Sequence, residues 1–204
     1  MKKLTKLFLV IAIALTSNQL FAQAFDDGKN LISLGFGFPP TSEITQSLTT
    51  YQNDQDYDYK NYGTVILKYE HGFAKYFGIG LSAEYSGANV TYQYTVHRVF
   101  NPDTNYKVNI NNNVFGAYLR LNGHYPIGDK FDIFAGVGLG YLYIQNNSTD
   151  NNPNSTSNDY KTQSLVFNAQ FTLGARYMIK DHIGLFAEVG WASTNVQVGV
   201  TFGF

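Results

Sequence analysis

The sequence predicts an all-β fold, an eight-stranded antiparallel up-and-down β-barrel whose strands cross a membrane. Apolar residues recur at every second position in eight segments of about ten residues each, and the connections between these segments alternate between short and long. Charged residues make up only 14% of the chain, against roughly 25% in typical soluble domains. Something other than a charged, water-facing surface must therefore cover much of the protein.

The first 22 residues have the pattern of a secretory signal peptide. Lys2, Lys3 and Lys6 precede an apolar run at 7–15, and the small residue Ala22 suits a cleavage site. The run is far shorter than the ~20 residues that a membrane-spanning helix needs. We expect cleavage after Ala22 and a single barrel domain over residues 23–204.

Charge and cysteine content exclude several classes of protein. Loss of the three lysines with the signal peptide changes the formal net charge from −1 to −4. No basic stripe compensates for this charge, so nucleic acid is not an expected partner. The chain has no cysteine, which excludes disulfides and a lipoprotein anchor. No later apolar run is long enough for a membrane-spanning helix.

The first four expected strands each place apolar residues on one parity and small or polar residues on the other. Residues 30–38 (NLISLGFGF) alternate aliphatic and aromatic residues with Ser and Gly. Residues 64–70 (TVILKYE) carry Lys and Glu on the polar parity, and 77–86 (FGIGLSAEYS) carry Glu and Ser there. Residues 114–125 (VFGAYLRLNGHY) place Arg, Asn and His on it. This period of two predicts strands with one apolar face.

The second half of the chain repeats the pattern in four more segments. Residues 131–143 (FDIFAGVGLGYLY) and 165–177 (LVFNAQFTLGARY) are the longest, and their second parity holds mostly Gly, Asn, Gln and Thr. Residues 183–191 (IGLFAEVGW) end on the single tryptophan, and 195–204 (NVQVGVTFGF) end on a phenylalanine. Eight strands, an even number, are therefore expected.

The connections favour a membrane barrel over a soluble sandwich. Short turns fall at 71–76, 126–130 and 179–182, whereas long polar stretches cover 39–62, 88–112 and 145–163, and a tight loop lies near 192–195. Short periplasmic turns and long extracellular loops are typical of outer-membrane barrels. A β-sandwich would need a charged, hydrated second face, but here that face is mostly small and uncharged.

Aromatic residues at the segment ends predict girdles at the two bilayer interfaces. The residues expected there are Phe77, Tyr85, Tyr125, Phe131, Tyr141, Tyr143, Tyr177 and Trp191.

With these features the chain resembles the small eight-stranded barrels of the OmpA/OmpX type, in the outer membrane protein β-barrel family, over nearly all of residues 25–204. The "FAQ" around the expected cleavage site resembles exported proteins of Bacteroidetes-type bacteria. In such families the last strand ends in Phe, with apolar residues at alternate positions before it. The resemblance therefore implies that Val200, Phe202 and Phe204 form the signal read by the barrel-assembly machinery.

The apolar parity switches after Tyr85, from odd positions to even ones such as Val90 and Tyr92. It switches back between Ile110 and Phe115. Two explanations fit. The third and fourth strands run on beyond the membrane as a ribbon, where the outer face meets water, or a bulge at Gly87 reverses the faces.

Seven charged residues fall on the parity that faces the lumen, and opposite charges in a narrow lumen are expected to pair, because an unpaired buried charge is costly. A structural plug and a gate for small ions both fit them. They are Lys68, Glu70, Glu84, Arg120, Asp132, Arg176 and Glu188.

No motif indicates an enzyme, a cofactor or a metal. The four histidines lie far apart in sequence without metal-ligand spacing or an obvious catalytic partner. Asp54, Asp56 and Asp58 resemble the start of a calcium loop but lack its glycine and its final acidic residue.

The leading hypothesis is a non-enzymatic integral outer-membrane barrel that anchors surface loops and supports envelope integrity. Two alternatives stay open. One is surface adhesion or ligand binding by loops rich in Tyr, Asn and Thr, and the other is a small-solute or ion pore gated by the lumen charges. The expected partners are outer-membrane lipid or lipopolysaccharide and the assembly machinery, and the protein is expected to be monomeric.

Overall fold

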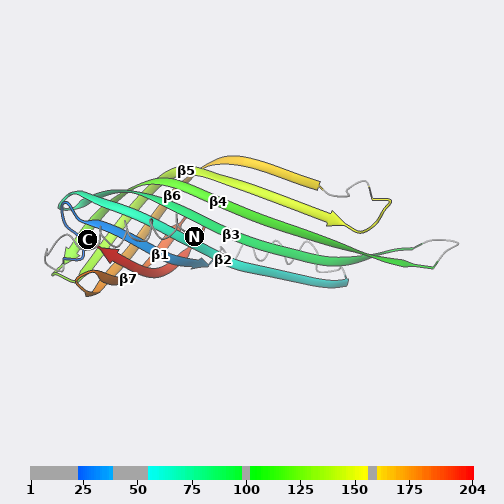
Figure 1. Ribbon diagram of the computed structural model, residues 1–204, viewed down its shortest axis with the longest axis horizontal. Coiled ribbons are helices and arrows are strands. Elements are labelled where there is room, and N and C mark those ends of the chain that lie inside the picture. Colours follow the sequence, from blue (N-terminus) through cyan, green and yellow to red (C-terminus); the bar gives the residue numbers. More distant parts are fainter. Residues whose placement is uncertain (1–22, 39–54, 98–101, 156–159) are drawn as a thin grey trace, which may run out of the picture.

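The computed structural model describes residues 23–38, 55–97, 102–155 and 160–204, and within them the chain forms a closed barrel of eight antiparallel strands (Figure 1). The strands are β1 (Asn30–Phe38), β2 (Gln55–Ala74), β3 (Phe77–Val96), β4 (Thr104–Ile127), β5 (Phe131–Asp150), β6 (Tyr160–Lys180), β7 (Ile183–Trp191) and β8 (Val196–Gly203). Each strand pairs with the next, which confirms the predicted fold class. The expected signal peptide, residues 1–22, lies outside the described residues.

The last strand closes the barrel against the first. The β1–β8 register runs from Leu31 opposite Gly203 to Phe38 opposite Val196. Past the end of β8, the backbone groups of Asn30 and Phe204 exchange two hydrogen bonds of 2.8 and 2.9 Å. Closure leaves no open edge along these strands, and an open edge is not tolerated in hydrocarbon.

The two faces of the barrel reverse the arrangement of a soluble protein. The apolar residues point outward, as Leu81 (58% exposed) and Leu119 (56%) show. The polar residues point inward, and Asp132 and Thr201 are fully buried. In the part of the chain that the structure describes, no helix is long and apolar enough to cross a membrane.

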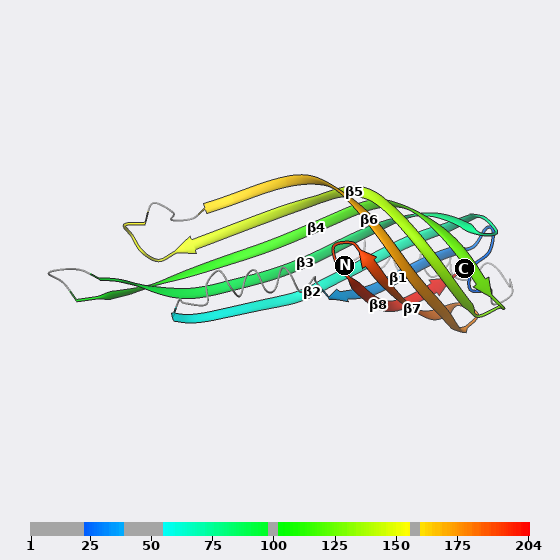
Figure 2. The same ribbon diagram turned by 180° about the vertical axis from the view of Figure 1, so that it is seen from behind.

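Five strands run well past the barrel, which corrects the predicted loop boundaries. Residues 55–62, 88–96, 104–112, 145–150 and 160–163, all expected in long loops, are strand. The reason is that β2 begins at Gln55, β3 reaches Val96, β4 begins at Thr104, β5 reaches Asp150 and β6 begins at Tyr160. Figures 1 and 2 show β2 to β6 extending to one side, whereas β1, β7 and β8 stay within the barrel. The sequence suggested such an extension only for the third and fourth strands. For β2, β5 and β6, polar side chains on the outer face give no pattern of outward apolar residues from which to predict it.

The bulge at Gly87 is wrong, because β3 and β4 run on past the barrel as a paired ribbon; that the ribbon lies beyond the membrane stays a prediction. The β3–β4 register is unbroken from Phe77 opposite Gly123 to Val96 opposite Thr104. The irregularity lies in the partner strand, where β2 shifts register between Asn61 and Thr64. Gly63 takes a φ of +72° there, a value that suits glycine.

The faces of the extension follow from this unbroken register. Even-numbered residues of β4 face inward throughout, so Tyr106 and Val108 are buried on the inner side of the extension. The outer side carries polar residues, as expected where it meets water. The ribbon has five strands rather than the two that the sequence suggested.

Candidate functional site

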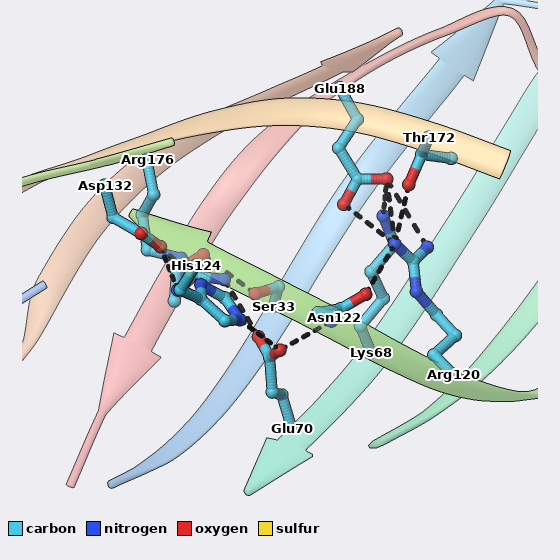
Figure 3. A network of polar contacts seen from close by, with 11 residues as sticks. Ser33, Lys68, Glu70, Arg120, Asn122, His124, Asp132, Thr172, Arg176 and Glu188 are labelled. Carbon is cyan, nitrogen blue, oxygen red and sulfur yellow. Dashed lines mark hydrogen bonds and ion pairs between the residues drawn. The ribbon is translucent and has the colours of Figure 1, made fainter. Parts of the chain in front are cut away.

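The inward-facing charges of the barrel form two groups of contacts, shown in Figure 3. The central cluster contains Lys68, Arg120 and Glu188 with the neutral side chains Thr172 and Gln197. The turn-side cluster contains Glu70, His124, Asp132 and Arg176. Residues two apart on one strand face the same side of the sheet. Lys68 and Glu70 of β2 therefore both face the lumen, one in each cluster.

The central cluster is organised around one carboxylate. Glu188 Oε2 lies 2.7 Å from Lys68 Nζ and 3.4 Å from Arg120 Nη1. Lys68 also donates to Gln197 Oε1 (2.7 Å), and Arg120 Nη2 donates to Thr172 Oγ1 (2.9 Å). Two cations thus share one anion, and each also donates to a neutral side-chain oxygen.

The turn-side cluster holds a histidine between two carboxylates. His124 Nε2 lies 2.8 Å from Glu70 Oε1, and its Nδ1 lies 2.8 Å from Asp132 Oδ2. An ionised carboxylate only accepts hydrogen bonds, so both ring nitrogens must donate, which requires the doubly protonated imidazolium. Arg176 spans the same two carboxylates, at 3.1 Å from Glu70 Oε2 and 3.3 Å from Asp132 Oδ2.

Asn122 joins the two clusters. Its Nδ2 donates to Glu70 Oε1 (2.5 Å), and its Oδ1 accepts from Arg120 Nη2 (3.4 Å). The cavity that the two clusters line measures about 10 Å³, close to the least room that one water molecule needs. Gly136 faces the same space, where a Cβ would lie 2.7 Å from Arg120 Nη2. Side chains therefore fill the lumen at this level, as expected for eight strands.

Glu84 stands apart from both clusters. It is buried, and its Oε1 accepts a hydrogen bond of 2.8 Å from Gln170 Nε2. Of the seven charged residues singled out in the sequence, the structure therefore brings six into the two clusters and leaves Glu84 with a neutral partner.

Two residues of the site were missed by sequence reasoning. His124 has no obvious partner in the sequence, yet it lies at the centre of the turn-side cluster. Phe25 lies before the first strand, is 1% exposed, and stacks on His124 with ring centroids 3.5 Å apart and planes 5° apart. The parity of His124, which matches that of Arg120, was a usable signal, but nothing local to Phe25 indicates a buried position.

The segment around Phe25 closes the mouth of the barrel on the side of the short turns. Ala24 is fully buried, Gly28 N donates to Gly72 O (2.8 Å), and Gly72 N donates to Lys29 O (2.8 Å). The Lys29 ammonium contacts the carbonyl of Gln23. Burial, and next the Arg176 charge, lower the pKa of Lys29 to about 8.

The residues expected in the girdles lie on the outer face. At the turn side Phe131 pairs with Tyr177, and at the other side Tyr85, Phe115 and Tyr143 lie in register on neighbouring strands. The remaining members are Phe77, Tyr125, Tyr141 and Trp191, which are 52%, 68%, 53% and 83% exposed.

The residues expected to guide assembly lie on the closing strand. Val200 pairs with Leu34 and with Leu185, and Phe202 pairs with Ile32 and with Ile183. Their side chains face outward, on the parity opposite to that of the buried Thr201.

The chemistry of the lumen is that of mutually compensating fixed charges. Within the described residues, no group of three His, Cys, Asp or Glu has the arrangement of a metal site. The segment that resembled a calcium loop lies partly outside the described residues, since Asp54 is not among them. Asp58 pairs with Lys60 (2.8 Å), and Asp56 accepts from Gln93 (2.8 Å).

Comparisons with known proteins agree with this architecture. The family model described as "Outer membrane protein beta-barrel domain" matches residues 8–202. No curated protein matches the chain.

Several solved structures are similar. The chain is 13% identical to the N-terminal β-barrel domain of OprF from Pseudomonas aeruginosa, with a TM-score of 0.42, covering 88% of this chain and 98% of that one. The chain is 10% identical to Ail, the attachment invasion locus protein of Yersinia pestis, with a TM-score of 0.43, covering 87% of this chain and 99% of that one. It is 13% identical to the outer membrane protein OprG from Pseudomonas aeruginosa, with a TM-score of 0.46, covering 91% of this chain and 99% of that one.

Proposed function

The chain belongs to the outer membrane protein beta-barrel domain family, and we propose that it is a non-conducting, non-enzymatic barrel of the bacterial outer membrane. In this proposal it anchors the extracellular part of β2 to β6 and supports envelope integrity. The observation that carries the proposal is the filled lumen, in which both clusters are buried and Phe25 covers the turn-side cluster. The family places the outer face of the barrel in contact with lipid.

Ion conductance in planar bilayers tests the proposal. The wild-type protein is expected to show no steady channel, because the paired charges leave a cavity of only about 10 Å³ at their level of the lumen. Arg120→Ala removes the guanidinium at the centre of the lumen, and Phe25→Ala removes the cover of the turn-side cluster. If the Arg120 guanidinium and the Phe25 ring block the lumen, the Arg120→Ala, Phe25→Ala double variant conducts while the wild type does not.

A steady wild-type conductance that Arg120→Ala changes in size or selectivity would contradict the proposal and support the ion pore instead. Asn111→Thr, on the outer face of the extension, is the matched control and leaves conductance unchanged. Heat-dependent migration in gels confirms that each variant is folded before it is measured.

Surface adhesion is the second candidate function, and the five-stranded extension supports it. Strands that rise beyond the lipid present a rigid surface, and its inner side carries Tyr94 and Tyr106 with rings 5.8 Å apart. A variant in which residues 91–109 are replaced by a short turn tests it. If the barrel still folds and whole cells lose attachment to a host surface, adhesion is supported, and unchanged attachment contradicts it.

Export and assembly complete the proposal. Residues 1–22 act as a signal peptide that is removed after Ala22, and the mature protein is a monomer. Mass measurement of protein from an outer-membrane fraction tests the cleavage. Deletion of Phe204, which completes the apolar series with Val200 and Phe202, is expected to slow insertion by the assembly machinery but not spontaneous folding in detergent.

A further inference from the structure

The outer face of the extension carries cross-strand rows of amide side chains, here called the amide face. In one row Asn89 of β3 lies opposite Asn111 of β4, which lies opposite Asn147 of β5. In the neighbouring row Asn113 lies opposite Gln145, and Gln145 lies opposite Gln163 of β6. The amide face consists of Asn89, Asn109, Asn111, Asn113, Gln145, Asn147 and Gln163.

The amide face is continuous with the lipid-contacting surface. Tyr85, Phe115, Tyr143 and Leu165 form the last apolar row on four neighbouring strands. On β4, β5 and β6 the next outward residue is already an amide of the face, and on β3 it is Gly87 and then Asn89. A molecule that packs its apolar part against the barrel thus meets amides where its polar part begins.

Strand formation does not explain these residues. Asparagine is among the residues depleted in β-strands, and threonine is among the enriched ones, so threonine would serve the same solvent-facing positions with a better fit. The amides are also held in place. Asn89 Nδ2 donates to Asn109 Oδ1 and to Asn111 Oδ1, both at 2.7 Å, and Thr91 Oγ1 donates to Asn89 Oδ1 (3.3 Å).

The chemistry of such a face suits a saccharide. Each amide offers an acceptor and two donors, which matches the hydroxyl groups of a sugar ring. Strand pairing repeats these groups about every 4.8 Å across the sheet and about every 6.8 Å along a strand. A cation ends the Asn89 row on each side, because Lys60 lies opposite Asn89 and Lys161 lies opposite Asn147. The Asp58 carboxylate, 2.8 Å away, already pairs with the Lys60 ammonium, so the Lys161 ammonium is the one that suits a phosphate of an anionic glycolipid.

We propose that the amide face binds the saccharide part of the glycolipid in the outer leaflet that surrounds the barrel. The lipid-contacting rows take the acyl chains, the amides hydrogen-bond to the sugar hydroxyls, and Lys161 meets phosphate. This role goes beyond the proposed structural function, and it uses none of the lumen residues.

The test compares one triple variant and one double variant of the full mature chain with the wild type in detergent. Asn89→Thr, Asn109→Thr and Asn111→Thr together remove three amides and keep polar, strand-favouring residues. The matched control is Asn112→Thr with Asn146→Thr, two asparagines that lie opposite each other on β4 and β5, on the inner side of the extension. Single Asn111→Thr is the fallback if the triple variant does not fold.

The probes are rough lipopolysaccharide, its delipidated core oligosaccharide and lipid A without core sugars, measured by calorimetry and native mass spectrometry. The wild type is expected to bind the core oligosaccharide and to prefer rough lipopolysaccharide to lipid A. The triple variant is expected to lose at least about tenfold in affinity for both sugar-bearing probes, while the control pair retains it.

Two results would overturn the proposal as a whole, and a third would overturn its assignment to glycolipid. One is equal binding of rough lipopolysaccharide and lipid A with no binding of the oligosaccharide, which would mean that acyl chains and phosphate alone are recognised. The other is equal affinity of the triple variant and the wild type. An unrelated neutral glucan oligosaccharide that binds as tightly as the core would also overturn the assignment to glycolipid. None of these variants is expected to change conductance, because none alters a residue of the lumen clusters. The glycolipid proposal and the proposal of a non-conducting barrel can therefore be refuted separately.

Discussion

Replacing Arg176 by methionine is expected to lower the free energy of unfolding by about 3–5 kcal/mol, the cost of breaking a buried ion pair from one side. The Arg176 side chain is buried and contacts Glu70 at 3.1 Å and Asp132 at 3.3 Å. Methionine fills much of the same volume, so the loss comes mainly from two carboxylates that share only His124 as a cation. The loss of Arg176 affects Asp132 more than Glu70, since within the described residues the Oδ1 atom of Asp132 already has no hydrogen-bond partner.

Urea titration in lipid vesicles, followed by the fluorescence of Trp191, measures the change. Lys161→Met, on the exposed outer side of the extension, is the control and is expected to stay within about 0.5 kcal/mol of the wild type. Adding Asp132→Asn to Arg176→Met is expected to recover part of the loss, because it removes one unpaired charge. A cost below about 1 kcal/mol, as for an exposed ion pair, would refute the view that the turn-side cluster is shielded from water.

Two further predictions concern the rim and the turns of the barrel. Gly63→Ala places a Cβ at φ +72° against the Phe36 ring, whereas Gly128→Ala at φ +64° meets open space. Urea titration should show a loss of about 1–2 kcal/mol in the free energy of unfolding for Gly128→Ala, from backbone strain alone, and a larger loss for Gly63→Ala. Equal losses would contradict the close packing of Phe36 against Gly63. Lys29→Met is expected to stabilise the protein at pH 7, because the lowered pKa of about 8 reflects a cost of burying the charged form. The folded state binds fewer protons than the unfolded chain between pH 8 and 10.5, so the stability of the wild type rises over that range. The variant should therefore lose its advantage in stability by about pH 10.5. A difference in stability that stays constant with pH would contradict this explanation.

Much of the barrel follows from the sequence because the face of a strand residue is a local property. The alternation in 131–143 and 183–191 was sufficient to predict β5 and β7, whose observed starts and, for β7, end agree with it. The same alternation assigned Glu70, Arg120 and Glu188 to the lumen side, where the structure finds them buried. The full extension does not follow from the same alternation, since its outer face is polar and carries no apolar period of two; only its third and fourth strands are suggested by the parity switch.

The sequence by itself determined the fold class, the closing strand and the parity of each charged residue, because all three depend on a period of two along one strand. Only the tertiary structure decided which charges meet, because register and closure set contacts between residues as distant as Glu70 and Arg176. The same holds for His124, which gains its carboxylates from two other strands, and for Phe25, which precedes every strand. The amide rows also exist only across strands, since Asn89, Asn111 and Asn147 become neighbours through hydrogen-bond register rather than through sequence.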